Sequence, residues 1–191
     1  MLKLSMAIIT IGGNIGAGKT TLAGRLTKAL GYGEFSMSRL FRDMAAERTM
    51  TLEDFYADIR KYPALERGVD ERQMRLMREK DDFIVQGRVA WYFAKESSFA
   101  VLNIILTVDP ATGAERTARR EENAGKTVEE LIRANALRVS QERERYKMLY
   151  EIENFLDPGH YDFALDTSHL DETEVFQGVL SKAKEMLEAD I

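Results

Sequence analysis

Several residue types that support common protein architectures are scarce in this 191-residue sequence. Cysteine is absent, which excludes disulfide frameworks and thiolate metal sites. The two histidines, His160 and His169, do not stand at a spacing typical of metal ligands. Only 3 prolines are present, and no Ser/Gly-rich stretch offers an interdomain linker. No apolar run approaches the roughly 20 residues of a membrane-spanning helix, and the first residues show no signal-peptide pattern. We therefore expect a cytoplasmic protein.

An excess of positive charge is also missing. The chain has 32 acidic against 27 basic residues, a net charge of −5, which argues against nucleic acid as the main partner. A hydrophobic content of 45% over this length suffices for one compact domain with a proper core. Nothing in the sequence defines the oligomeric state, and a monomer is the simpler expectation.

The most specific motif is G-N-I-G-A-G-K-T at residues 13–20, directly preceded by the apolar run Ala7–Ile11. A strand before and a helix after it are the context of the phosphate-binding loop GxxxxGK[ST]. Glycines let successive backbone N–H groups point at phosphate oxygens, and the helix adds the positive end of its dipole. Lys19 can reach the β- and γ-phosphates, and the Thr20 hydroxyl can complete the shell of a bridging Mg²⁺. The motif predicts a nucleoside triphosphate site formed by Gly13, Asn14, Ile15, Gly16, Ala17, Gly18, Lys19, Thr20 and Thr21.

Five short apolar runs are typical of parallel core strands. Helical stretches separate them, and this alternation predicts a doubly wound α/β sheet with helices on both faces. We expect one domain over residues 1–191, closed by an amphipathic helix from about Asp171 to Leu187. The predicted strands are Ala7–Ile11, Glu34–Met37, Phe83–Gln86, Leu102–Val108 and Phe163–Asp166.

The segment between the second and third predicted strands is helical and charged. We expect Ser38 to cap a helix that runs through Arg48. Thr51–Asp54 has the pattern of a capping box and would open a second helix that ends near Pro63. A third helix is predicted from about Glu66 to Lys80. The block is long for a plain crossover, so we favour a small helical lobe, at about residues 38–80, over the mouth of the sheet.

A second helical block, Ala111–Tyr150, lies between the fourth and fifth predicted strands. Gly125 interrupts a run dense in arginine, and Thr127 with Glu130 forms a capping box that restarts the helix. This pattern predicts a mobile helical lid at about residues 114–130. A solvated, charged helix with a turn is the alternative.

Arginines from separate segments are expected at one edge of the sheet. Arg88 directly follows the third predicted strand, at the end where ligands bind in open α/β sheets. Arg138, Glu142 and Arg145 share a helical face at spacing i, i+4, i+7, and Arg42 follows the second strand by one helical turn. Phosphoryl transfer between two anionic substrates needs such cations, because charge on donor, acceptor and migrating group must be neutralised. An exposed ion-pair ladder, worth little, is the alternative.

Taken in order along the chain, these motifs resemble the nucleoside monophosphate kinases, specifically the cytidylate kinases of the short, archaeal type. The resemblance implies a P-loop NTPase fold with a five-stranded parallel sheet, a helical NMP-binding lobe and a helical lid. It also implies phosphoryl transfer from ATP, with Mg²⁺, to CMP or dCMP. Besides the phosphate loop, the matching segments are Ser36–Arg42, Met50–Phe55, Val69–Gln73, Gln86–Arg88, Arg116–Glu121, Arg138–Tyr146 and Tyr161–Ser168.

The resemblance implies roles for individual residues as well. Glu142 would accept hydrogen bonds from the sugar or base of the acceptor, and Ser168 would lie near the adenine. No general base is required, because a monophosphate oxygen is already a nucleophile, and catalysis would be alignment and charge neutralisation. The resemblance places Ser36, Arg42 and Asp70 in the monophosphate site. It places Arg88, Arg138 and Arg145 on the transferred phosphate, and Arg116 and Arg120 on the donor phosphates. The predicted catalytic residues are Lys19, Arg88, Arg116, Arg120, Arg138 and Arg145.

Three positions depart from the family pattern. Ser38 replaces a glycine, and the loop Asn14–Gly18 is similar to that of deoxynucleoside kinases. Gln86 stands where the family has a carboxylate that helps to hold the hydration shell of Mg²⁺, which predicts weaker Mg²⁺ dependence or slower turnover. Gln86→Glu is therefore expected to raise activity at limiting Mg²⁺.

Two alternatives stay open at this point. The first is a related kinase with another acceptor, either a different nucleotide or a deoxynucleoside. A deoxynucleoside kinase is disfavoured, because it needs a base to take the proton of the acceptor hydroxyl and Gln86 cannot act as one. A non-catalytic ATP-binding homologue is disfavoured because Lys19 and the arginines are all present.

Overall fold

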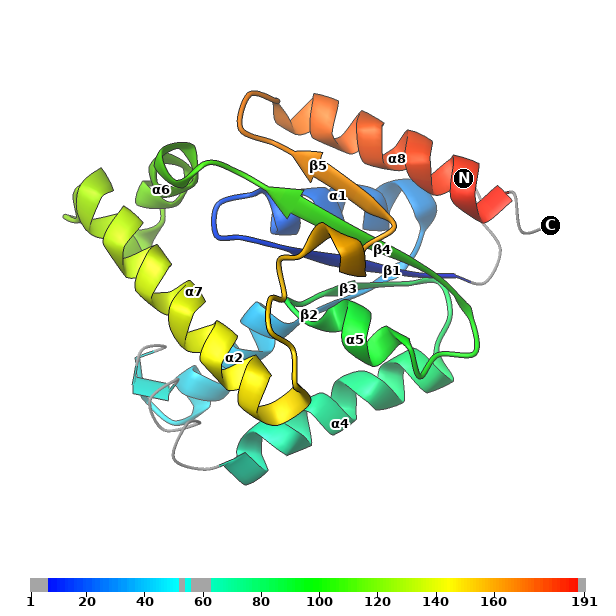
Figure 1. The fold of residues 1–191 in the computed structure, drawn as a ribbon, viewed down its shortest axis with the longest axis horizontal. Helices are drawn as coiled ribbons and strands as arrows, with labels where there is room; N and C mark the ends of the chain where they lie inside the picture. Colours follow the sequence, from blue (N-terminus) through cyan, green and yellow to red (C-terminus); the bar gives the residue numbers. More distant parts are fainter. Residues whose placement is uncertain (1–6, 52–53, 56–62, 189–191) are drawn as a thin grey trace.

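Figure 1 shows the computed structural model, which describes residues 7–51, 54–55 and 63–188. Five strands form one parallel sheet in the order β2-β3-β1-β4-β5. The predicted parallel sheet is confirmed, and each predicted strand ends within two residues of its observed limits. The strands are β1 (Ala7–Gly13), β2 (Gly33–Ser36), β3 (Phe83–Gln86), β4 (Ala100–Thr107) and β5 (Phe163–Asp166).

The central strand β1 is buried along its whole length, because helices cover both faces of the sheet. Its side chains alternate between two cores, as the strand period requires. Ile9 and Ile11 pack with helices α1 (Lys19–Leu30) and α8 (Glu172–Glu188). Ile8 packs on the other face with α4 (Pro63–Glu79) and α5 (Ala90–Ala94). In Figure 1, α1 and α8 lie on one side of the strands and α4 and α5 on the other.

The helices after β2 begin earlier than predicted. Ser36, not Ser38, caps α2 (Met37–Glu47): its Oγ accepts the N–H of Arg39 at 3.4 Å. The strand therefore runs directly into the helix. Likewise α4 begins at Pro63, a residue favoured in a first turn. The helix predicted to open at Thr51 falls largely outside the described residues, although the N–H of Asp54 donates to Thr51 Oγ1 at 3.1 Å.

Helices α6 (Pro110–Ala118) and α7 (Val128–Tyr150) confirm the predicted break in the second block. A short 3₁₀ turn, Glu121–Asn123, joins them, followed by Gly125 at φ 83°. The predicted capping box is present, since Thr127 Oγ1 accepts from the N–H of Glu130 and the Glu130 carboxylate accepts from the N–H of Thr127. Figure 1 shows α6 and α7 beyond the carboxyl ends of the strands.

None of the helices in the described part of the chain is long and apolar enough to cross a membrane. The five-residue helix α5 was not predicted. It follows β3 directly and is almost fully buried, so it has no exposed polar face to mark it.

Candidate active site

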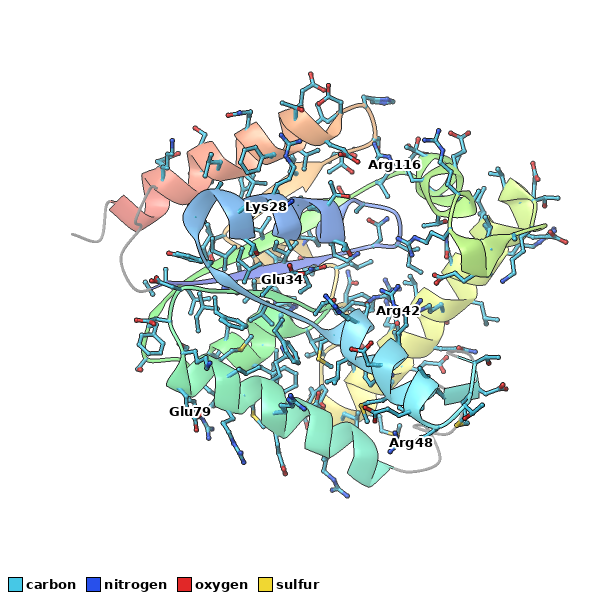
Figure 2. All side chains as sticks on the ribbon, turned by 180° about the vertical axis from the view of Figure 1, so that it is seen from behind. Lys28, Glu34, Arg42, Arg48, Glu79 and Arg116 are labelled. Atoms are coloured by element: carbon cyan, nitrogen blue, oxygen red, sulfur yellow. The ribbon has the colours of Figure 1, made fainter. Side chains whose placement is uncertain are left out.

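A cavity of about 760 Å³ opens at the carboxyl ends of the strands. It is lined by the phosphate loop, the end of β3 and helices α2, α4, α6 and α7. Arg42 of α2 and Arg116 of α6 line it from two sides; Figure 2 shows them below and above the phosphate loop. The structure thus brings both predicted helical blocks to the same place.

The phosphate loop needs glycine at two positions for space as well as for backbone conformation. At Gly13, with φ +129°, a Cβ would lie 1.9 Å from the carbonyl oxygen of Leu106. At Gly16, with φ +83°, it would lie 2.3 Å from the carbonyl oxygen of Gly113. Gly18 also has a positive φ, +86°, but a Cβ there would meet nothing within 4 Å. The loop is therefore pressed against both β4 and α6.

Side chains of the loop fix it further. Asn14 Nδ2 donates to the carbonyl oxygen of Val108 at 2.7 Å, and Asn14 Oδ1 accepts from the N–H of Val108 at 3.0 Å. Lys19 Nζ donates to the carbonyl oxygens of Gly13 at 2.9 Å and Asn14 at 2.6 Å. The loop's lysine and asparagine thus hold its curved backbone.

The positive charge around Lys19 is concentrated. Burial lowers the pKa of Lys19 well below its usual range, and Arg88, Arg120 and Arg138 lower it further. Like charges gathered in a partly desolvated place disfavour the protonated amine. Bound phosphate oxygens would supply the missing negative charge, so the site suits a polyanion.

Glu142 links the predicted arginines on α7 with the end of β3. Its buried carboxylate accepts from Arg138 Nε at 3.1 Å and forms an ion pair with the guanidinium of Arg88. Arg145 Nη2 donates to the hydroxyl of Tyr146 at 3.0 Å. Arg88, Arg138, Glu142 and Arg145 all line the cavity, so the i, i+4, i+7 row faces the site.

Helix α4 brings two polar side chains into the cavity. Asp70 is buried and accepts a hydrogen bond from the hydroxyl of Tyr150. Gln73, one turn further, is 1% exposed, and its Nε2 has no hydrogen-bond partner in the described ranges. Sequence reasoning assigned no role to Gln73. The i, i+3 spacing from Asp70 was the available signal, since it places both on one helix face.

The two predicted lid arginines have different surroundings. Arg116 Nη1 donates to Thr167 Oγ1 at 3.0 Å, and its Nη2 donates to the carbonyl oxygens of Thr167 at 2.7 Å and Leu170 at 3.2 Å. Arg120 is half exposed, with Glu122 3.7 Å away. Arg116 is therefore anchored to the loop after β5, while Arg120 lies more freely on the rim.

Four predicted residues do not line the cavity: Gly13, Asn14, Ser36 and Ser168. Gly13 and Asn14 instead hold the start of the phosphate loop against Leu106 and Val108. Ser36 caps α2. Ser168 Oγ donates to Asp166 Oδ1 at 2.5 Å and accepts from the N–H of Asp109 at 2.9 Å, next to the start of α6. Both serines hold helix starts that border the site.

Among the described residues, the oxygen donors that line the cavity are not gathered into a carboxylate cluster. The described ranges contain no group of three His, Cys, Asp or Glu side chains that could hold a metal ion. Thr20 and Gln86 line the cavity and offer a hydroxyl and an amide carbonyl. This set fits Mg²⁺, which is commonly held by substrate phosphates and water with one or two protein oxygens.

The fold and the phosphate loop together define a P-loop nucleotide-binding protein. A family model described as AAA domain matches residues 9–142. Among solved structures, a shikimate kinase from Bacteroides thetaiotaomicron has a TM-score of 0.63 at 16% identity, covering 96% of this chain and 99% of that chain. A gluconokinase from Sinorhizobium meliloti has a TM-score of 0.59 at 16% identity, and the match covers 98% of this chain and 97% of the gluconokinase. At this identity the likeness shows the fold alone.

Curated relatives are more specific. A cytidylate kinase from Methanopyrus kandleri is 36% identical to this chain, and the match covers 100% of this chain and 99% of the relative. One from Pyrococcus furiosus is 38% identical, with 88% of this chain and 84% of the relative covered. One from Thermoplasma acidophilum is 31% identical, with 96% of this chain and 95% of the relative covered. The chain belongs to the cytidylate kinase family, which confirms the resemblance seen in its motifs.

Proposed function

We propose that this protein transfers the γ-phosphoryl group of ATP to CMP or dCMP, giving ADP and the cytidine diphosphate. One observation carries the proposal: a single cavity joins the phosphate loop to the Arg88–Glu142–Arg138 cluster. A donor triphosphate and an acceptor phosphate would both meet cations there. The relatives named cytidylate kinase support the choice of acceptor.

At the donor end, the backbone of the phosphate loop and Lys19 would bind the β- and γ-phosphates. Mg²⁺, with Thr20 and water in its shell, would neutralise the charge that develops between these phosphates. Arg116, anchored beside the loop after β5, would fix the donor side. The half-exposed Arg120 would move with the lid. We therefore assign the lid to about residues 114–130 of a single kinase domain, 1–191.

At the acceptor end, the helical lobe at about residues 38–80 would bind the monophosphate, with Arg42 on its rim. Arg88, Arg138 and Arg145 would take the acceptor phosphate and the migrating group. The acceptor oxygen is already anionic, so these residues need only align it and neutralise charge. Excluding water by closure of the lobe and lid would prevent hydrolysis of ATP.

We further propose that Asp70 and Gln73 read the base. Cytosine presents a 4-amino donor beside ring acceptors, so a carboxylate and an amide N–H form its complement. Gln73 Nε2 has no partner in the described segments, and pairing it would relieve the cost of burying an unsatisfied donor. Uracil would instead set a carbonyl oxygen against Asp70. Gln73→Leu should therefore lower kcat/KM for CMP and reduce the ratio of kcat/KM for CMP to kcat/KM for UMP. Gln177→Leu, an exposed control on α8, should change neither quantity.

An ADP-release assay with ATP and Mg²⁺ tests the proposed function. Candidate acceptors are CMP, dCMP, UMP, AMP, GMP and deoxycytidine. Acceleration by CMP and dCMP supports the proposal. Acceleration by deoxycytidine alone, or none while ATP still binds, would replace it with a nucleoside kinase or a non-catalytic binder. The proposal includes a cytoplasmic monomer that acts on small nucleotides rather than on nucleic acid or membranes.

A further inference from the structure

Gln86 differs from an ordinary buried amide in how its hydrogen bonds are used. It ends β3, is 5% exposed and lines the cavity. Its Nε2 donates to Glu34 Oε1, on the neighbouring strand β2, at 2.5 Å. Within the described segments this is the one hydrogen bond of the Gln86 side chain. The carbonyl oxygen of the amide is therefore left for the cavity.

Glu34 determines which end of the amide faces the cavity. An ionised carboxylate only accepts hydrogen bonds, so it must face the NH₂ group of Gln86. The opposite orientation would bring two oxygens together. Glu34 is exposed while Gln86 is buried, so water screens part of this interaction. A hydrogen bond to a charged acceptor still polarises the amide, so that its carbonyl oxygen becomes a better acceptor.

The position of Gln86 ties this pair to the phosphate loop. In the sheet Gln86 is the register partner of Ile11, two residues before the loop's first glycine, and the N–H of Gly87 donates to the carbonyl oxygen of Ile11 at 3.2 Å. Gln86 and Thr20 line the same cavity. The amide carbonyl thus lies at the edge where Mg²⁺ would be hydrated beside the donor phosphates.

We propose that Glu34 is a positioning residue for the magnesium site, acting through Gln86. Its carboxylate orients the amide so that the carbonyl oxygen accepts a hydrogen bond from a metal-bound water. The negative charge of Glu34, one hydrogen bond away from the metal-bound water's acceptor, would supply the electrostatic stabilisation that a carboxylate at position 86 would otherwise give. This rests on the proposed function only in assuming that a magnesium–nucleotide complex binds at the phosphate loop.

The pair changes what Gln86→Glu should do. A glutamate at 86 would place a second carboxylate at hydrogen-bond distance from Glu34, and two such groups cannot both ionise without cost. The single substitution should therefore fail to strengthen Mg²⁺ binding, in contrast to the expectation from sequence alone. Exchanging the two residues, Glu34→Gln with Gln86→Glu, keeps one carboxylate and one amide and avoids the repulsion.

The experiment titrates Mg²⁺ into the protein with a non-hydrolysable ATP analogue and follows the melting temperature. Glu34→Gln should raise the half-saturating Mg²⁺ concentration by about tenfold, in the range found for residues that orient metal ligands. Affinity for the analogue in EDTA should not change. The double variant should bind Mg²⁺ as well as the wild type or better. Glu47→Gln, an exposed carboxylate on α2, is the matched control and should behave as wild type.

Two results would overturn the inference: Glu34→Gln titrating like its control, or Gln86→Glu alone strengthening Mg²⁺ binding. If Glu34→Gln lowers the melting temperature without ligand, the double variant decides, because it keeps the same pair of chemical groups. The readout needs no acceptor. A failure of CMP phosphorylation with an intact Mg²⁺ effect would therefore reject the proposed function and keep the role of Glu34, and the converse pattern would do the opposite.

Discussion

Replacing Glu142 with glutamine would test how the arginine cluster is held together. The Glu142 side chain is 9% exposed, and its partner Arg88 is 11% exposed, so this pair is effectively buried. Removing one member of a buried pair costs about 3–5 kcal/mol, because the other charge stays desolvated. Arg138 is 36% exposed, so water screens its ion pair with Glu142. We therefore take the lower end of this range, about 3 kcal/mol, as the expected loss of stability.

A loss of about 3 kcal/mol corresponds to a fall of about 6–12 °C in melting temperature for a chain of this size. The measurement is thermal unfolding of Glu142→Gln without nucleotide. Glu144→Gln, on the exposed face of the same helix, is the control. Surface substitutions are usually within about 0.5 kcal/mol, so it should shift the midpoint by only about 1–2 °C. If Glu142→Gln behaves like this control, the cluster does not depend on Glu142.

Ligand makes the test sharper. An acceptor phosphate would bring the negative charge that the substitution removes. CMP should therefore raise the melting temperature of Glu142→Gln by more than it raises that of the wild type. Equal increases would mean that the acceptor phosphate does not meet Arg88, and would refute the assignment of the acceptor end.

Three further substitutions probe separate parts of the site. Because the pKa of Lys19 is lowered in the folded protein, the unfolded chain binds more protons, and stability from this group rises with pH from the lowered pKa up to the usual one. Lys19→Met should remove that rise with pH and abolish the shift of melting temperature by ATP; a rise with pH that persists in the variant would contradict this. In denaturant titrations Gly13→Ala should be far more destabilising than Gly18→Ala, which has open space and meets only left-handed strain of about 1–2 kcal/mol; equal losses would disprove the close packing. Arg88→Ala should lower kcat by about 10³-fold or more with little change in ATP affinity, and a loss of ATP binding in calorimetry would show that its role is misplaced.

Much of the fold was predictable because four of the five strands, all but β2, are short runs of mainly apolar residues. The junction after β2 was not, because Ser36 and Ser38 are equally good caps. Pairing of β2 with β3 as far as Ser36 and Gln86 decides between them, and that pairing is a tertiary contact. The short helix α5 escaped prediction because burial on all sides leaves no amphipathic period.

The site was predictable where spacing alone fixes geometry. Arg138, Glu142 and Arg145 had to share a helix face, and Arg88 had to lie at the carboxyl end of β3. The contact between Glu34 and Gln86 joins residues 52 positions apart, and no local pattern indicates it. The lack of a partner for Gln73 Nε2 is likewise a property of packing rather than of sequence.

The hydrogen bonds between Asn14 and Val108, together with the close approach of Gly16 to Gly113, join the phosphate loop to the base of α6. Amide hydrogens at this junction should exchange with solvent only when the whole domain unfolds, whereas those near Gly125 should exchange through local opening. ATP would then meet a loop that needs no rearrangement, and its association rate should be set by diffusion and charge rather than by a folding step.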